Sequence, residues 1–163
     1  MITNKIGIYP GTFDPITNGH VDIIERSVML FEKVIVAVTN NPKKSPLFTV
    51  DERVDMIRTV VQGMKNIEVE SFNELLVNYA LKRNATAIIR GLRATSDFEY
   101  EFQMALVNRK LASNLLTVFL MPNEKYTYLN STIVKELGRL DGDIADFVPK
   151  EIHSRIISKL DKR

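Results

Sequence analysis

The length, composition and charge of the chain exclude several classes of protein. Its 163 residues suggest one domain, and 45% hydrophobic with 26% charged residues is typical of a globular protein with a full core. The 22 Lys and Arg residues nearly balance the 20 Asp and Glu residues, so bulk charge indicates neither a nucleic-acid nor an anionic-membrane partner. The absence of cysteine excludes disulfides, thiolate nucleophiles and cysteine metal sites, and it is compatible with the reducing cytoplasm that we expect as the location. We expect no signal peptide and no membrane helix, because the chain enters an apolar strand at once and no apolar run approaches ~20 residues.

Apolar segments rich in β-formers alternate with segments of helical spacing along the whole chain. This alternation predicts an α/β fold with a Rossmann-like, doubly wound, five-stranded parallel sheet, in a single domain over residues 1–163. Val34–Val38 is apolar without interruption, as expected of a strand that is covered on both faces. Pro149 predicts the start of a closing helix at about 149–162, in which His153 lies off the apolar stripe and is expected at the surface. The expected strands are Ile6–Tyr9, Val34–Thr39, Ile67–Glu70, Ala87–Ile89 and Thr117–Leu120.

The connection between the first strand and the first helix carries the main functional signal. It is rich in turn formers, and the residues from Val21 to Phe31 that follow it have the apolar spacing of a helix. Open α/β sheets bind phosphorylated ligands at such a loop, because unpaired N–H groups and the helix dipole favour an anion there. Gly11 and Gly19 allow a phosphate to approach the backbone closely.

His20 lies at the predicted first turn of this helix, where its ring can point toward the same anion. A nearby phosphate would favour the protonated ring, which donates hydrogen bonds to phosphate oxygens. A single histidine is more often a capping or surface residue. The spacing of His20 from Thr17, after a Gly-Thr-Phe-Asp-Pro turn, favours the functional interpretation.

Basic residues follow two further strands at the same edge of the predicted sheet. The loop Asn40–Pro46 contains Lys43 and Lys44, for which a solvated turn is the ordinary interpretation. After the fourth strand, Arg90 and Arg93 flank a Gly-Leu pair, and an arginine fork can hold a phosphate through two hydrogen bonds. A pair of surface arginines is the alternative.

Asn130, Ser131 and Thr132 precede another segment of helical spacing. Such small polar residues are typical of a helix N-cap. The same geometry suits the β- and γ-phosphates of a nucleoside triphosphate, and Lys135, one turn later, would add positive charge to the pyrophosphate. Both interpretations remain open.

The helix predicted after Ser96 is apolar on two faces. Phe98 and Phe102 belong to one stripe, and Tyr100 and Met104 belong to the other. A helix with two apolar faces is expected to pack against its own sheet and against a further surface, so we predict a homo-oligomer contact here.

The segments Tyr9–Pro15 and Thr17–His20 resemble the HIGH-type nucleotidyltransferase superfamily. Within it, the chain is similar nearly end to end to the bacterial phosphopantetheine adenylyltransferase family. The resemblance implies transfer of an adenylyl group from ATP to 4′-phosphopantetheine, giving dephospho-CoA and pyrophosphate, the penultimate step of coenzyme A biosynthesis. It also implies Mg²⁺ on the triphosphate, a hexamer built as a dimer of trimers, and no nucleic-acid or membrane partner. Asn130 departs from the serine of the superfamily, which alters one possible phosphate contact.

The resemblance further implies roles for individual residues. His20 would stabilise the transition state, with Lys44 and Arg93 as additional catalytic residues and no direct metal ligand. Glu101 would lie near ATP, where a carboxylate is unfavourable unless it meets a ribose, an arginine or a metal. The acceptor would be bound by Thr12, Lys44, Leu76 and Arg90. ATP would be bound by Thr12, Phe13, His20, Gly91, Leu92, Arg93, Glu101, Tyr126, Thr127, Tyr128, Leu129, Asn130, Ser131 and Thr132.

Two other functions remain as alternatives. One is a related nucleotidyltransferase with another phosphorylated acceptor, such as a nicotinate nucleotide. The other is a non-catalytic nucleotide-binding module of flavodoxin-like shape. A fragment of an aminoacyl-tRNA synthetase is disfavoured, because the chain has no Lys-Met-Ser-Lys-Ser loop and no basic patch.

Overall fold

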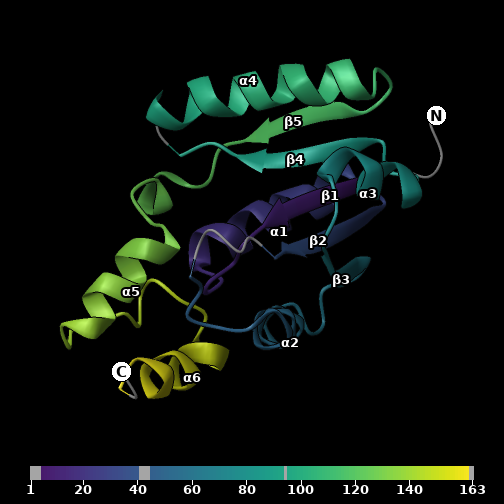
Figure 1. Ribbon diagram of the computed structural model, residues 1–163. Coiled ribbons are helices and arrows are strands. Elements are labelled where there is room, and N and C mark those ends of the chain that lie inside the picture. The colour runs from purple at the N-terminus through teal and green to yellow at the C-terminus, as the bar shows by residue number, and fades with distance from the viewer. Residues whose placement is uncertain (1–4, 41–44, 94, 162–163) are drawn as a thin grey trace.

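A computed structural model describes residues 5–40, 45–93 and 95–161 of the chain (Figure 1). The described residues form a five-stranded sheet in the order β3-β2-β1-β4-β5, and every pair of neighbouring strands is parallel. In chain order the elements are β1 (Ile6–Gly11), α1 (Asn18–Leu30), β2 (Lys33–Thr39), α2 (Val50–Val60), β3 (Ile67–Phe72), α3 (Leu76–Lys82), β4 (Ala87–Gly91), α4 (Thr95–Leu111), β5 (Leu116–Leu120), the 3₁₀ turn η1 (Glu124–Tyr126), α5 (Ser131–Arg139) and α6 (Lys150–Leu160). The predicted α/β class and all five predicted strands are confirmed.

Strand β1 occupies the centre of the sheet and determines where a ligand can bind. It pairs with β2 on one side and with β4 on the other, so the direction in which the chain adds strands reverses between β1 and β4. In open α/β sheets, ligands bind in the crevice outside the carboxyl ends of the strands at such a reversal. The loop after β1 leads into the first turn of α1, which contains His20, and the loop after β4 contains Arg93.

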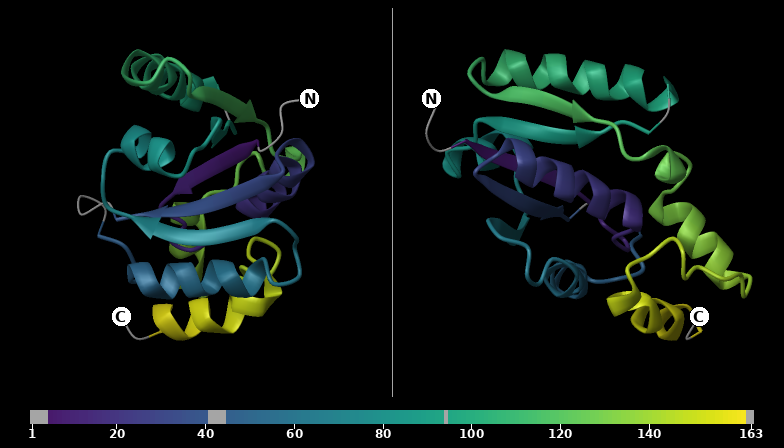
Figure 2. Two further views of the ribbon diagram at one scale, coloured as in Figure 1. Left: turned by 90° about the vertical axis from the view of Figure 1, so that its right-hand side faces the viewer. Right: turned by 180° about the vertical axis from the view of Figure 1, so that it is seen from behind.

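Helices lie on both faces of the sheet (Figure 2), and a hydrophobic layer covers each face. Helices α1 and α2 pack on one face with α5 and α6 beyond them, and α3 packs on the other face. Val34, Val36 and Val38 of β2 contribute to the first layer, whereas Ile35 and Ala37 contribute to the second. This alternation confirms that β2 is apolar throughout because both of its faces are buried.

Local sequence signals account for several helix ends. Thr49 and Glu52 form the capping box expected at the start of α2, with hydrogen bonds in both directions. Pro149 immediately precedes α6, as predicted, and the expected end of that helix at 162 lies outside the described residues. None of the helices in the described segments combines the length and apolar character required to cross a bilayer.

Helix α4 differs from the sequence-based expectation. Both predicted apolar stripes stay largely exposed within the single chain, including Phe98, Phe102 and Tyr100. The side of the helix that is buried instead contains Glu101 and Asn108. The prediction that one apolar stripe packs on the sheet is therefore wrong, because these polar residues line the cavity described below, where Glu101 pairs with Arg90.

Candidate active site

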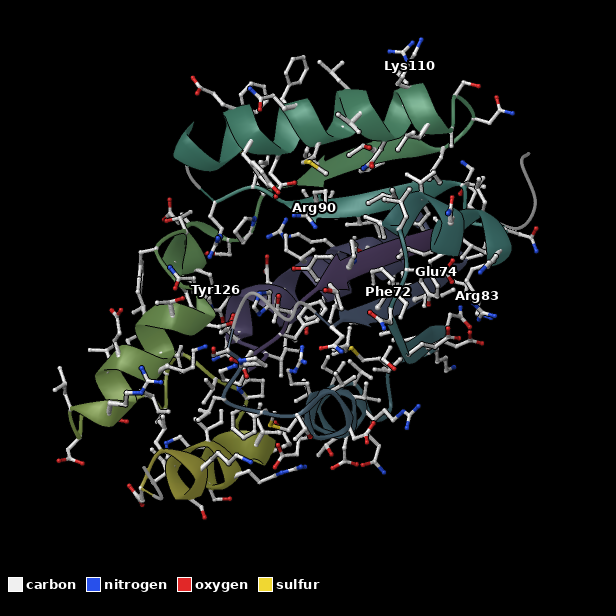
Figure 3. All side chains as sticks on the ribbon, viewed as in Figure 1. Phe72, Glu74, Arg83, Arg90, Lys110 and Tyr126 are labelled. Atoms are coloured by element: carbon white, nitrogen blue, oxygen red, sulfur yellow. The ribbon has the colours of Figure 1, made fainter. Side chains whose placement is uncertain are left out.

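A cavity of about 1310 Å³ opens at the carboxyl ends of β1 and β4. Arg90 of β4, which is labelled in Figure 3, is one of the residues that line it. Its walls come from the β1–α1 loop, the end of β4, the inner side of α4 and the start of α5. Pockets for a single small ligand usually measure about 300–1,000 Å³, so this cavity has room for two ligands side by side. The predicted ligand edge of the sheet and the observed cavity coincide.

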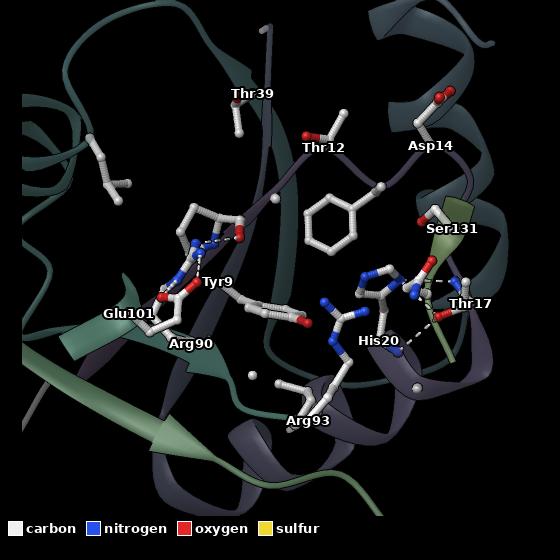
Figure 4. Close-up of a pocket in the computed structure, with 18 of the residues that line it drawn as sticks. Tyr9, Thr12, Asp14, Thr17, His20, Thr39, Arg90, Arg93, Glu101 and Ser131 are labelled. Carbon is white, nitrogen blue, oxygen red and sulfur yellow. Dashed lines mark hydrogen bonds and ion pairs between the residues drawn. The ribbon is translucent and has the colours of Figure 1, made fainter. Parts of the chain in front are cut away.

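His20 lies at the third position of α1, and a capping box holds its ring (Figure 4). The backbone N–H of Thr17 donates to Nδ1 of His20 at 3.0 Å, while the Thr17 hydroxyl lies 3.0 Å from the same nitrogen. The Thr17 hydroxyl in turn accepts from the backbone N–H of His20 at 3.4 Å. Because Nδ1 accepts a hydrogen bond, the proton of the neutral ring is on Nε2, the nitrogen that is left to act as a donor.

The surroundings of His20 favour its neutral form. Burial is the main cause, and the nearby positive charge of Arg93 adds to it, so that the pKa of His20 falls from 6.5 to about 4. The sequence led us to expect that a phosphate bound beside the ring would favour its protonated form. The structure shows that protonation is not required for donation, because the neutral ring already carries its proton on the outward nitrogen.

The backbone of the β1–α1 loop adopts an unusual conformation at Phe13. Its φ of 49° lies in the left-handed region, which disfavours a non-glycine residue by roughly 1–3 kcal/mol. The ring is buried and packs edge-on against Tyr9 and His20, with centroid distances of 5.3 and 5.1 Å. Phe13 was predicted to bind ATP, and its buried ring means that a polar contact from this residue comes from its backbone.

Arg90 and Glu101 form an ion pair on the α4 side of the cavity (Figure 4). Nε of Arg90 donates to Oε2 of Glu101 at 2.6 Å, and Nη2 donates to the other carboxylate oxygen. Glu101 therefore meets an arginine, one of the three partners that would make a carboxylate acceptable here. Glu101 thus occupies the Nε–Nη2 edge of the guanidinium, where a phosphate could have been bound through two hydrogen bonds. Nη1 lies on the other side and donates to the carbonyl of Pro10 at 3.4 Å.

The start of α5 joins the β1–α1 loop at the opposite side of the cavity. Oδ1 of Asn130 accepts from the N–H of Ile133 at 2.9 Å, which confirms the N-cap interpretation. The Ser131 hydroxyl donates to the carbonyl of Pro15 at 2.7 Å. Arg93 donates to the carbonyl of Leu129 at 3.2 Å, and its guanidinium lies beside the ring of His20 (Figure 4). The helix start and Arg93 thus face the same space as His20.

The structure places the other predicted site residues differently. Leu76 and its neighbour Leu75 both line the cavity, and Leu75 is about half exposed. Lys43 and Lys44 lie outside the described residues. The cavity wall contains the predicted residues Thr12, Phe13, His20, Leu76, Arg90, Gly91, Arg93, Glu101, Leu129, Asn130, Ser131 and Thr132. The described wall does not contain Leu92, Tyr126, Thr127 or Tyr128.

The segment before α5 shows why several predicted contacts are absent from the cavity wall. Tyr126 packs against the start of α1. Its Cβ atom is only 3.4 Å from the position that a Cβ atom would occupy on Gly19. The Thr127 hydroxyl donates to the carbonyl of Glu124, and the ring of Tyr128 contacts Phe147. These side chains therefore make their contacts within their own segment, with α1 or with the α5–α6 connection, and not in the cavity wall.

Two buried ionic groups were not predicted: Asp14, which belongs to the cavity wall, and Arg53, which lies behind it. Asp14 accepts from the backbone N–H groups of Leu47 and Phe48, and from Nζ of Lys135 at 2.7 Å. Lys135 was expected to add positive charge to a pyrophosphate, but its ammonium is neutralised by Asp14 in the structure. Arg53 of α2 is 1% exposed and donates to backbone carbonyls only. One signal was present for Arg53, because it precedes the buried Met56 and Ile57 by three and four residues, on the same face of α2.

Comparisons with known proteins identify relatives of this chain. Residues 8–137 match the cytidylyltransferase-like family. The phosphopantetheine adenylyltransferase of Alkaliphilus metalliredigens is 55% identical over 155 residues, covering 95% of this chain and 98% of that protein. The phosphopantetheine adenylyltransferase of Caldanaerobacter subterraneus subsp. tengcongensis is 52% identical over 158 residues, covering 97% and 99%.

A solved structure shows the same fold at much lower sequence identity. The bifunctional NMN adenylyltransferase/ADP ribose pyrophosphatase from Francisella tularensis superposes with a TM-score of 0.72 at 14% identity. The match covers 97% of this chain and 50% of that protein, so it concerns the fold alone. The full-length relatives are informative at a finer level, and with the cytidylyltransferase-like match they show that this chain belongs to the phosphopantetheine adenylyltransferase family.

Proposed function

We propose that the protein transfers the adenylyl group of ATP to 4′-phosphopantetheine, forming dephospho-CoA and releasing pyrophosphate. The observation that carries the proposal is the position of His20, whose Nδ1 is held by Thr17 while Nε2 keeps its proton inside a cavity large enough for two ligands. The relatives named phosphopantetheine adenylyltransferase, at 55% and 52% identity over nearly the whole chain, support the choice of substrates.

The reaction needs no catalytic base, because a phosphate oxygen of the acceptor is already an anionic nucleophile. It attacks the α-phosphorus of ATP, forming a P–O bond, while the bond from that phosphorus to the oxygen of pyrophosphate breaks. Catalysis then consists of in-line positioning and stabilisation of the charge that develops on the transferred group. We assign that stabilisation to Nε2–H of His20, supported by Arg93.

Other residues of the cavity would hold the two ends of the reactants. Ser131, Thr132 and the N–H groups at the start of α5 are suited to the departing pyrophosphate. Thr12, which lines the cavity, would contact both substrates. The acceptor would meet Leu76 and the remaining Nη1 side of Arg90. The role of Lys44 toward the acceptor phosphate stays a prediction.

Mg²⁺ is proposed as the cofactor of the triphosphate. Within residues 5–40, 45–93 and 95–161, no group of three or more His, Asp or Glu side chains is placed to hold a metal ion. This donor set fits an ion that is bound mainly by phosphate oxygens and water, as is usual for Mg²⁺. When bound, the ion would neutralise charge on the triphosphate. The cytoplasmic location expected from the cysteine-free sequence also stays a prediction.

The substrates are tested by an assay of pyrophosphate release with ATP and a panel of acceptors. We expect turnover with 4′-phosphopantetheine and formation of dephospho-CoA, with at least 100-fold lower kcat/KM for nicotinate mononucleotide. A preference for the nucleotide acceptor would support the related-nucleotidyltransferase alternative. Tight ATP binding without pyrophosphate release from any acceptor would support the non-catalytic module.

The role of His20 is tested by the substitution His20→Ala. Loss of one well-placed transition-state donor lowers kcat by ~10²–10³-fold in other enzymes, and we expect a loss of this size. His153→Ala is the matched control, because the only other histidine of the chain lies on α6, away from the cavity. Turnover of His20→Ala within about tenfold of the control would refute the assigned role.

A further inference from the structure

Arg53 is a charged residue that is buried beneath the cavity without belonging to its wall. It lies in the first turn of α2, is 1% exposed, and is one of the largest fully buried side chains. The described cavity wall contains Thr12 and Thr39, two residues that Arg53 contacts, but not Arg53 itself. Burial of a guanidinium is unfavourable unless its N–H groups find acceptors, so the contacts of Arg53 indicate why it is retained.

In the described part of the chain, Arg53 donates four hydrogen bonds, and all of them go to backbone carbonyls. Nε donates to Phe48 and Thr49 at 3.1 and 3.2 Å, which anchors the side chain to the start of its own helix. Nη1 donates to the carbonyl of Thr12 at 2.7 Å and to the carbonyl of Thr39 at 3.0 Å. One nitrogen therefore joins two segments that are 27 residues apart in sequence (39 − 12).

The two carbonyls lie just where the pairing of β1 with β2 ends. The last residues paired between these two strands are Gly11 and Val38. The next residues are Thr12, which follows β1, and Thr39, which ends β2 and still pairs with Phe72 of β3. Beyond Gly11 and Val38, no ladder joins β1 to β2. Arg53 takes the place of the missing ladder and fixes both chain segments as they enter the cavity wall.

The contact with Thr12 sets the orientation of the next peptide group. The Thr12–Phe13 peptide is trans, so its N–H points away from the carbonyl that Arg53 holds. Within the described part of the chain, the hydrogen bonds do not include one from the N–H of Phe13. The left-handed φ of Phe13 is the kind of disfavoured conformation that persists only where surrounding contacts enforce it.

We propose that Arg53 is a positioning residue that holds the Thr12–Phe13 peptide with its N–H directed toward the reacting phosphate. The N–H lies in the residue whose ring contacts that of His20, so the two donors serve the same end of the cavity. The inference rests on the proposed adenylyl transfer. It assigns a function to a side chain on α2 that touches neither substrate.

The kinetic test compares Arg53→Met and Arg53→Lys with the control Arg58→Met. Arg58 lies on the same helix and donates to the carbonyl of Val69 in β3, at 3.1 Å, so its loss also removes an arginine–carbonyl bond between α2 and the sheet. We expect kcat to fall at least tenfold in Arg53→Met, with KM for ATP and for the acceptor changed less than threefold. Arg53→Lys, which keeps a charged donor, should be intermediate, and Arg58→Met should keep kcat within twofold of wild type.

The comparison of kcat with the Arg58→Met control separates positioning from general loss of structure. Partial unfolding would reduce the fraction of active molecules in the control as well as in the Arg53 variants. A kcat of Arg53→Met within twofold of Arg58→Met would overturn the proposal, and so would a loss of kcat/KM that comes entirely from KM. If Arg53→Met does not fold, Arg53→Lys decides, and a kcat within twofold of the control overturns the proposal.

Crystal structures of the variants provide a readout that does not depend on turnover. We expect the Thr12–Phe13 peptide to rotate in Arg53→Met, or in Arg53→Lys if only that variant folds, and φ of Phe13 to leave the positive region. Arg58→Met should keep the peptide as it is. An unchanged peptide in the Arg53 variant overturns the inference. Absence of turnover in wild type, with the expected rotation in the variant, overturns the proposed function instead.

Discussion

The tautomer and the pKa of His20 depend on residues at different separations in the sequence. Its tautomer follows from the backbone N–H of Thr17, three residues earlier, which occupies Nδ1. Its lowered pKa follows from burial and from Arg93, which the fold brings from 73 residues later (93 − 20). A neutral donor at physiological pH is therefore a joint product of a local capping motif and of the β1–β4 neighbourhood.

The lowered pKa predicts how stability depends on pH. The pKa of His20 is about 4 in the folded protein against 6.5 for an ordinary histidine, so between these values the unfolded chain binds the proton more readily. The contribution is fully present above pH 6.5 and is lost as the pH falls toward 4. Between pH 7.5 and 4.5, the free energy of unfolding of wild type should fall by about 2 kcal/mol more than that of His20→Gln, which cannot titrate. Denaturant unfolding of both proteins at the two pH values measures this difference, and an equal fall in both would contradict it.

Helix α5 shows how one element can serve stability and binding together. Its first N–H groups need partners whether or not a ligand is present, and Asn130 supplies one of them through Oδ1 at 2.9 Å from the N–H of Ile133. The Ser131 hydroxyl ties the same helix start to the carbonyl of Pro15. The capping and phosphate-binding interpretations of this sequence therefore do not exclude one another.

The capping role of Asn130 leads to a stability prediction. Replacement of an N-cap asparagine by alanine typically lowers stability by about 1 kcal/mol, and we expect this for Asn130→Ala. Asn130→Ser, which restores the residue type of the superfamily, should keep the cap and lose less than half as much. Denaturant unfolding of the three proteins provides the comparison. A loss in Asn130→Ala no larger than that in Asn130→Ser would show that the cap does not contribute.

At the scale of the whole molecule, α4 is a helix whose apolar side chains are not covered by the rest of the single chain. One side of it closes the cavity through Glu101, while Phe98, Phe102, Leu106 and Leu111 are about half exposed. Contiguous apolar surface of this kind on a helix is typical of an interface between protein chains. It supports a contact between copies of this chain, and the dimer of trimers that the family resemblance implies stays a prediction.

The assembly is tested by Phe102→Glu, with Met29→Glu as the control. Met29 is more exposed than Phe102 but lies on α1, away from the apolar side of α4. We expect light scattering at micromolar concentration to show a hexamer for wild type and for Met29→Glu, and a smaller species for Phe102→Glu, because a charge buried at an interface without a partner is unfavourable. A stable wild-type monomer at this concentration would refute the assembly.

Agreement between sequence and structure is greatest where short-range physics decides. Alternating strand and helix patterns determined the parallel α/β fold, since β2 must be apolar on both faces to lie between two helical layers. The turn and helix signals around Gly11–His20, and the small polar residues at Asn130–Thr132, were enough to identify the cavity edge and part of its wall.

Only the tertiary structure decided which charges are available in the cavity. Arg90 is paired with Glu101, and Lys135 is paired with Asp14, across 11 and 121 residues of sequence. Arg53 reads as an ordinary charged residue of an amphipathic helix, yet it holds the ends of two strands. The sequence by itself determined which strand ends and helix starts form the predicted anion-binding edge, because the signals for strands, turns and helix caps each span only a few residues. Which side chain neutralises or positions another depends on distances between remote segments, and these exist only once the chain has folded.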